Sequence, residues 1–532
     1  MPTYESDVCI IGAGISSAML AEKLTELGPG LAVTVVEAGS ALFDVSARIR
    51  NRQRNLDYGE SAWPGDVLED QAGAEGLVCL TMAVGGQALR WGGACNRFSE
   101  EDLRLKSMYG LAVDWPLSWT ELEKAYCEAE RRLNVFGEPS PYPEDKRSEP
   151  YPVRALTLSY NLQRLKEWAE RSALKFGPLP MAHNLKPFGG RGACCLFDTC
   201  GTVCPPGARY SPDFTFKQLA AEKKITLHDR TLVRKLVLDE RRPVVAAAQA
   251  VHRDRPDEKV EYRARTFVVG SGYAWSPHLL LLSACSRFPN GLANSSGLVG
   301  KYMNGHKIIQ GQATVDLQLY PGQNMAYSLI SRKFFRCPTD QPFVRHDTRV
   351  WESNAGRGPR LRDDNGRLLM GDALMEDWRG RTKGGSVRLR AYYDVHPDRE
   401  SRLVLHPTAR NKWGDPLFRI EHRLDAASLA REAATHQHIR GVFELLAKAD
   451  NGKLLSAGEG THLDHPGGGC RMGTDPAASV CDSYGRTHDH ENLFVVGAPT
   501  VPTAGCTNGA LTFVALALRS GDRIAADFAK RK

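Results

Sequence analysis

The stretch DVCIIGAGISS, residues 7–17, decides the fold class. Residues 7–12 form a short apolar run that predicts a buried parallel strand, and residues 18–27 predict a helix with one apolar face. The run AVTVVE, residues 32–37, predicts a second strand. Two strands joined by a helix form a β-α-β unit, so the sequence predicts an α/β fold that begins with a Rossmann-like domain.

The turn between the first strand and the helix predicts a dinucleotide site. Gly12 and Gly14 allow the backbone to approach a pyrophosphate at the positive N-terminus of the helix. Ser17 replaces the usual third glycine but is small enough for close packing, and Glu37 is placed to accept hydrogen bonds from an adenosine ribose. A ligand-free glycine turn is one alternative. A nicotinamide nucleotide is the other, disfavoured because later segments return to the same sheet.

Bulk properties exclude several classes of protein. A chain of 532 residues exceeds one compact core, so we expect two or three lobes. The net charge of +7 is small for this length, and no basic run is interleaved with aromatic residues, so nucleic acid is not an expected partner. No leader precedes the first strand and no window is apolar enough for a membrane span, which predicts a cytoplasmic chain.

Four further motifs carry a family resemblance. They are VGGQALRWGG (residues 84–93), NSSGLVGKYMNGH (294–306), HPGGGCRMG (465–473) and PTAGCTNGALT (502–512), with the strand NLFVVG (492–497) between the last two. Together they strongly resemble the glucose–methanol–choline (GMC) oxidoreductases. Within that family they are most similar to the branch of pyranose oxidases and bacterial gluconate, fructose and glucose FAD dehydrogenases. The resemblance spans nearly the whole chain and is weakest between about 311 and 454.

The resemblance implies a catalytic histidine and asparagine, which fall on His465 and Asn508. Oxidising an alcohol requires removal of the hydroxyl proton while a hydride leaves the carbon. A neutral imidazole can accept that proton, and an amide can donate to the substrate oxygen without competing for it. His462 is the nearest rival for the base. A histidine that merely caps a glycine-rich turn is the structural alternative.

The resemblance also places the cofactor. Besides the glycine turn and Glu37, the implied contacts with FAD fall on Gly85, Gly86, Arg90, Trp91 and Gly497. In covalently flavinylated pyranose oxidases the linking histidine stands just before the tryptophan of the GGxxxxW stretch. Arg90 holds that position here, and a guanidinium cannot form the histidyl–flavin bond, so we expect noncovalent FAD.

Four of the 13 cysteines cluster in CCLFDTCGTVCP, residues 194–205. In a chain without a leader, clustering points to metal or redox chemistry. The segment resembles the iron–sulfur loop of bacterial FAD glucose and fructose dehydrogenases, which implies a [3Fe-4S] cluster held by Cys194, Cys200 and Cys204. Zinc and free or bridged cysteines are the alternatives. Such a cluster would carry electrons from the flavin to an acceptor other than dioxygen.

The expected organisation is a Rossmann-like FAD-binding domain plus an α+β substrate domain with an antiparallel sheet. The FAD domain comprises residues 1–105, 215–310 and 455–532. Residues 106–214 form an extended excursion that carries the cysteines, and 137–214 show no clear repeating element. Residues 311–454 form the substrate-binding domain, with a helix at 426–449.

The expected function is oxidation of a CH–OH group of a sugar or glycoside, with electrons passed to an acceptor other than oxygen. The alternatives are an oxidase that uses dioxygen and a non-catalytic flavin-binding subunit. Relatives with the cysteine segment often work with a small helper subunit that carries an export signal, and sometimes with a cytochrome. Periplasmic residence by co-export is therefore the alternative to the cytoplasm.

Overall fold

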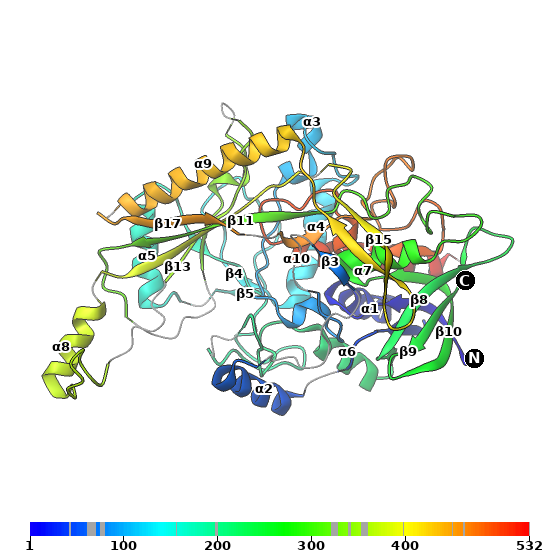
Figure 1. The fold of residues 1–532 in the computed structure, drawn as a ribbon, viewed down its shortest axis with the longest axis horizontal. Coiled ribbons are helices and arrows are strands. Elements are labelled where there is room, and N and C mark those ends of the chain that lie inside the picture. The colour runs from blue at the N-terminus through cyan, green and yellow to red at the C-terminus, as the bar shows by residue number, and fades with distance from the viewer. Residues whose placement is uncertain are drawn as a thin grey trace.

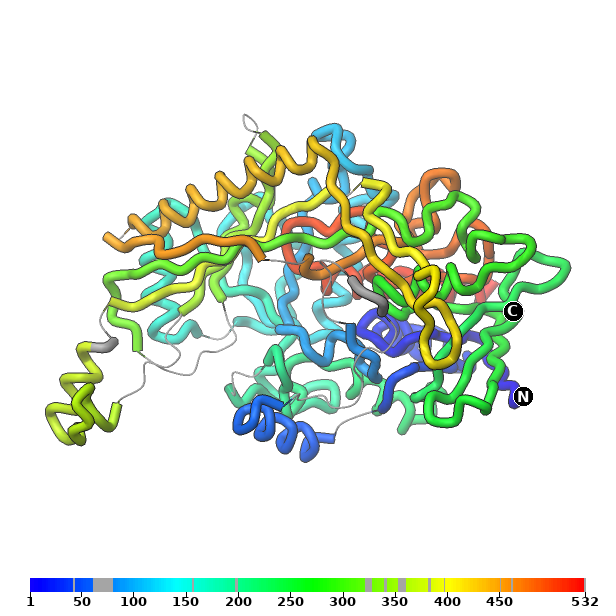
Figure 2. Tube along the Cα trace, in the orientation of Figure 1, coloured from blue at the N-terminus to red at the C-terminus, as the bar shows by residue number. Residues whose placement is uncertain are grey.

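The first sheet is built around the strand that leads into the glycine turn. β1 (Thr3–Ile11) lies between β2 (Val33–Val36) and β10 (Arg255–Val269), and the three strands are parallel. The sheet is completed by β7 (Thr226–His228), β8 (Thr231–Leu238), β9 (Val245–His252) and β19 (Leu493–Val495). Figure 2 shows the blue and red ends of the chain beside the green middle segment, so three distant parts of the sequence share this sheet.

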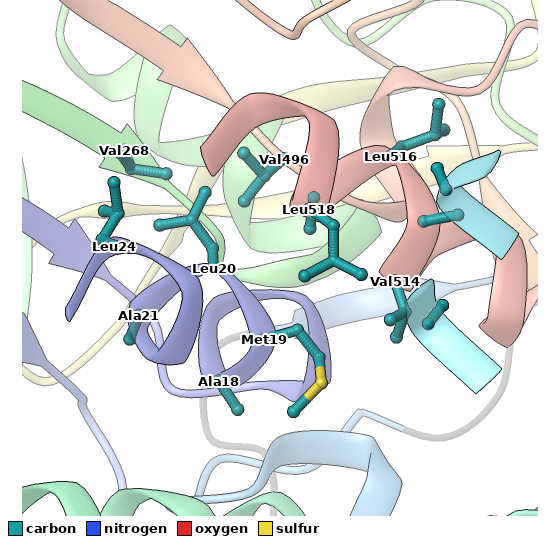
Figure 3. Close-up of a cluster of buried hydrophobic side chains, with 14 of the residues drawn as sticks. Ala18, Met19, Leu20, Ala21, Leu24, Val268, Val496, Val514, Leu516 and Leu518 are labelled. Atoms are coloured by element: carbon teal, nitrogen blue, oxygen red, sulfur yellow. The ribbon is translucent and has the colours of Figure 1, made fainter. Parts of the chain in front are cut away.

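Two helices pack together on one face of this sheet. α1 (Ile15–Leu27) follows the glycine turn and packs against α10 (Ala510–Ala529), as Figure 3 shows. Leu20 of α1 and Leu518 of α10 have no exposed surface. Burial of one such leucine contributes about 1.5–3 kcal/mol to the free energy of unfolding. The C-terminal helix therefore fixes the first βαβ unit, although the two are almost 500 residues apart.

The second sheet is antiparallel and lies at the left of Figure 1. Its central strands are β11 (Asn304–Thr314), β14 (Ser386–Tyr393) and β13 (Thr348–Glu352). Its remaining strands are β6 (Gly177–Pro178), β12 (Leu329–Ser331), β17 (Leu454–Glu459) and β18 (Asp464–Gly467). α9 (Ala426–Lys448) lies along one face, where Phe443 is completely buried. The sheet extends beyond residues 311–454 at both ends.

The computed structural model describes residues 1–41, 44–60, 71–74, 80–155, 157–196, 200–320, 328–338, 342–352, 360–382, 384–396, 398–449, 451–460 and 463–530. The other helices are α2 (Val45–Tyr58), α3 (Leu105–Tyr109), α4 (Trp119–Leu133), α5 (Tyr160–Glu170), α6 (Pro212–Ala221), α7 (Gly272–Leu282) and α8 (Gly371–Thr382). The other strands are β3 (Gln71–Ala74), β4 (Phe136–Gly137), β5 (Val153–Arg154), β15 (Arg402–Arg410) and β16 (Pro416–Glu421). Among the helices of these residues, none combines the length and apolar character needed to span a bilayer.

The predicted α/β class with an added antiparallel sheet is confirmed. One expectation was wrong: residues 137–214 are not devoid of regular structure, since they contain α5. Ser159 caps this helix by accepting a hydrogen bond from the Leu162 N–H at 3.2 Å, and Leu165 and Trp168 are buried on its inner face. The helical spacing of these apolar residues was the signal, hidden among the prolines and glycines on either side.

Candidate active site

A cavity of about 1000 Å³ lies between the two sheets. Its wall includes the glycine turn, the loop around Trp91, the inner face of β13 and β14, and the pair His465 and Asn508. Most ligand pockets are no larger than this. The cavity therefore has room for a large cofactor together with a small substrate.

The end of the cavity at the glycine turn fits a dinucleotide. Gly12 has φ +97°, and a Cβ there would lie 2.8 Å from the Gly270 carbonyl oxygen, so only glycine is accommodated. A Cβ on Gly86 would lie 3.2 Å from the Gly14 Cα. These glycines leave the backbone open beside the N-terminus of α1, where phosphates bind favourably. The Glu37 carboxylate accepts 2.7 Å hydrogen bonds from two backbone N–H groups, and it also lines the cavity.

The predicted cofactor residues divide into two groups. Those that line the cavity are Gly12, Gly14, Glu37, Gly86, Arg90 and Trp91. The others, Ser17, Gly85 and Gly497, lie behind its wall. Ser17 Oγ donates to the Gly270 carbonyl at 3.4 Å, and Gly85 N–H donates to the Ala13 carbonyl at 2.8 Å. This second group shapes the site through packing.

His465 and Asn508 meet at the other end of the cavity. Asn508 Nδ2 donates to His465 Nε2 at 2.7 Å. His465 Nδ1 is 2.7 Å from His306 Nε2. Because an amide nitrogen can only donate, the lone pair of the His465 ring is on Nε2 and its proton on Nδ1, from which it donates to His306. The basic nitrogen of His465 therefore points at the amide.

Burial keeps His465 neutral. It lowers the pKa of this histidine to about 4, assisted by Arg349 and Arg390 and opposed by Asp464. Burial also lowers the pKa of His306 well below its usual value. His465 also has φ +48° directly before a proline, a conformation that ordinary residues avoid. Strain of this kind is concentrated at functional sites.

A buried ion pair holds the amide in place. Arg349 donates to Asn508 Oδ1, which fixes which end of the amide faces His465. Asp347 accepts from Arg349 Nε at 2.9 Å and from Thr507 Oγ1 at 3.0 Å. Sequence reasoning missed Arg349, Asp347 and the role of His306. His306 could have been predicted, because it ends the KYMNGH motif. Nothing in the sequence distinguishes Arg349 from the other residues among the 69 lysines and arginines.

The cysteine segment lies beside the cavity, and Cys200 lines it. Arg209 ties the segment to the Trp91 loop, since its guanidinium donates to the carbonyls of Leu89, Trp91 and Cys200. Burial, together with the nearby thiols of Cys204 and Cys195, raises the pKa of Cys194. Within the described ranges, no three histidine, cysteine or acidic side chains converge on a point where a metal ion could bind. The arrangement thus does not assemble Cys194, Cys200 and Cys204 into a cluster site. Residues 197–199 and His462 lie outside the described residues.

The fold and this site define a flavin-dependent oxidoreductase, and comparisons with known proteins agree. Residues 397–517 match the family described as GMC oxidoreductase. The chain is 30% identical to the fructose dehydrogenase large subunit of Gluconobacter japonicus, with 99% of this chain and 98% of the relative covered. It is also 30% identical to paromamine 6'-oxidase of Streptomyces fradiae, over 99% of this chain and 92% of that one. The protein belongs to the GMC oxidoreductase family, whose members use FAD and oxidise sugars and other alcohols.

Two solved structures show the same fold. Pyridoxine 4-oxidase from Mesorbium loti matches with a TM-score of 0.62 and 18% identity, over 97% of this chain and 98% of that one. Formate oxidase matches with a TM-score of 0.66 and 12% identity, and both chains are covered completely. The architecture therefore persists where little sequence similarity remains.

Proposed function

We propose that this enzyme oxidises a CH–OH group of a sugar or glycoside to a carbonyl, with His465 as the base. The observation that carries the proposal is the hydrogen bond between His465 Nε2 and Asn508 Nδ2 at the edge of a cavity that fits FAD. A lone pair and an amide donor, side by side, are the two groups that an alcohol needs. Bound FAD would supply the hydride acceptor.

Substrate binding replaces the hydrogen bond between these two side chains, and the substrate hydroxyl takes a position in contact with both. It donates its proton to His465 Nε2 and accepts a hydrogen bond from Asn508 Nδ2. Because burial holds the pKa of His465 at about 4, the ring is neutral and available as a base at neutral pH. A positioned base of this kind contributes about 10²–10⁴-fold to the rate.

The surrounding residues keep this geometry. His306 Nε2 accepts a hydrogen bond from the Nδ1–H group of His465 and thereby fixes the ring and its tautomer. Arg349, anchored on Asp347, holds the Asn508 oxygen so that Nδ2 faces the substrate. These groups act by orientation, and they do not need to touch the reacting carbon.

The proposal includes noncovalent FAD and an acceptor other than oxygen. Arg90 lines the cavity at the position where the resemblance puts the linking histidine, which supports a noncovalent cofactor. Because Cys200 lines the cavity, we expect electrons to leave the flavin through the wall that carries the cysteine segment. The three cysteines do not form a metal site as placed, so we derive no electron path through a [3Fe-4S] cluster, and its presence stays a prediction.

Partners and location also remain proposals. The similarity to a protein named as a large subunit supports a helper subunit, with an electron-accepting protein as a further partner. We keep the cytoplasm as the expected location and co-export to the periplasm with a helper as the alternative.

The test is anaerobic mixing of the purified protein with a panel of sugars and glycosides, followed by loss of flavin absorbance. We expect at least one of them to bleach the flavin, and NMR of the product to show a new carbonyl. Failure of every sugar and alcohol would contradict the proposal. In the same preparation, acid precipitation should release all of the flavin. Iron with acid-labile sulfide would support the [3Fe-4S] cluster, whereas stoichiometric zinc without sulfide would overturn the prediction of that cluster.

A further inference from the structure

The face of the second sheet that is turned to the cavity is rich in arginine. Residues along a strand alternate between its two faces, so Arg388, Arg390 and Tyr392 of β14 share one face. All three line the cavity, whereas the intervening Leu389 and Ala391 are completely buried on the opposite side. The neighbouring β13 adds Arg349 and Trp351 to the same wall.

Two of these arginines are direct neighbours. The register pairs Arg349 of β13 with Arg390 of β14, and like charges opposite each other destabilise an antiparallel pair. Asp347 offsets the charge of Arg349. Arg390 has no such partner among the described residues, and its Nε is buried without a hydrogen-bond acceptor. Among the described residues, the positive charge of Arg390 is therefore not balanced by an acidic side chain.

The geometry around Arg390 is that of a prepared anion site. Its guanidinium carbon lies 4.8 Å from the Trp351 ring centre and 5.1 Å from that of Tyr392, and these rings fix its orientation. Besides Glu37 at the glycine turn and Asp415, which forms an ion pair with Arg234, two acidic residues line the cavity: Glu352, which accepts a hydrogen bond from Asn161, and Asp464, next to the base. Neither forms an ion pair with Arg390, so the guanidinium is available to a ligand.

The same side chains set where the anion would lie relative to the reacting carbon. The Tyr392 ring that contacts Arg390 is also 5.3 Å, centre to centre, from the ring of His465. Arg390 is near enough to His465 to lower its pKa. The guanidinium and the imidazole therefore both contact the Tyr392 ring, on the same wall of the cavity.

We propose that the preferred substrate is an anionic carbohydrate whose carboxylate or phosphate monoester binds Arg390, with Arg388 beside it. This inference rests on the proposed function, since it concerns the molecule that His465 deprotonates. The planar guanidinium can donate two parallel hydrogen bonds to either kind of anion. Arg349 is occupied by Asp347 and Asn508 and serves the amide.

The experiment compares matched substrates by the rate and apparent Kd of flavin bleaching without oxygen. Methyl glucoside is paired with methyl glucuronide, and glucose with glucose 6-phosphate, so the two arms separate a carboxylate from a phosphate. We expect the anionic member of at least one pair to bind more tightly in the natural protein. Arg390→Gln should raise its apparent Kd by about 10- to 100-fold and that of the neutral member by less than about threefold.

Controls distinguish recognition from a structural role. Arg390→Gln should not lower Tm, because it removes a repulsive cross-strand pair, whereas Arg390→Lys should restore part of the anion preference. Arg410→Gln, on the exposed surface of β15, should change neither. Added KCl should weaken binding of the anionic member alone.

Two outcomes would overturn the inference: equal affinity for both members of each pair, or equal losses for both in Arg390→Gln. Failure of the proposed function appears differently, as no bleaching by any carbohydrate. In that case, the anion site is still tested by titrating inorganic phosphate and glucarate while monitoring the flavin spectrum. A perturbation that Arg390→Gln abolishes supports the site, and a perturbation unchanged in that variant, or none at all, refutes it.

Discussion

The wall of the cavity at the glycine turn is mostly backbone, whereas at the opposite end it is mostly side chains. At the first end, Gly12 and Gly86 leave no room for a Cβ without close contact. At the second end, His465 and the arginines of β13 and β14 project from the second sheet, and Asn508 lies just before α10. A backbone wall suits a ligand that is always the same, while a wall of side chains can change with the substrate and leave the fold intact.

The largest expected effect comes from the side-chain end. His465→Ala should slow flavin reduction by about 10²–10⁴-fold, because the proton acceptor is lost, while FAD remains bound. Stopped-flow bleaching at saturating substrate measures the rate, and the ratio of flavin to protein measures retention.

His406→Ala is the matched control, since the ring of this half-buried histidine of β15 accepts hydrogen bonds from the backbone N–H groups of Thr408 and Ala409, away from the cavity lining. Its rate should equal that of the natural protein. Near-normal flavin reduction in His465→Ala would assign the base to another group, His462 being the first to examine.

A substitution at the backbone end of the cavity should instead weaken the binding of FAD. Gly12→Ala places a Cβ 2.8 Å from the Gly270 carbonyl and forces φ +97° on alanine. Strain of about 1–3 kcal/mol corresponds to a loss of roughly 5- to 150-fold in FAD affinity if the turn moves to relieve it. Dialysis followed by flavin fluorescence would measure this.

Gly30→Ala is the control for that substitution, because a Cβ there would meet nothing within 4 Å. Full retention of FAD by Gly12→Ala would mean that the turn tolerates a side chain. The distinction between the two ends of the cavity would then be lost.

The smallest effect concerns pH. An ordinary histidine base would produce a change in rate near pH 6.5, whereas the pKa of His465 is lowered to about 4. His465 is therefore neutral above about pH 4, and the flavin-reduction rate should be nearly constant from pH 6 to 8 and fall only as the pH approaches 4. A rate profile with a midpoint near 6.5 would contradict the burial of this ring.

The sequence predicted the backbone end of the cavity better than the side-chain end. Gly12, Gly14 and Glu37 were recognisable because local geometry needs glycine at fixed spacing between a strand and a helix. His465 and Asn508 were predicted by family resemblance, and the structure brings them within 2.7 Å of each other. Arg349 was not predicted, because its role depends on a partner 159 residues away.

The sequence by itself determined the class of fold, the glycine turn and the family, since each depends on short motifs whose physical meaning is local. Only the tertiary structure decided which residues surround the base, that Asp347 compensates Arg349, and that Arg390 on the cavity wall has no acidic partner in the part of the chain that the structure describes. It also decided that Ser17, Gly85 and Gly497 lie behind the wall. The reason is physical: strand pairing in the second sheet joins segments that are far apart in the sequence, such as Arg349 with Arg390 and Ile309 with Glu459. The identity of a cross-strand neighbour depends on a register that no local pattern encodes.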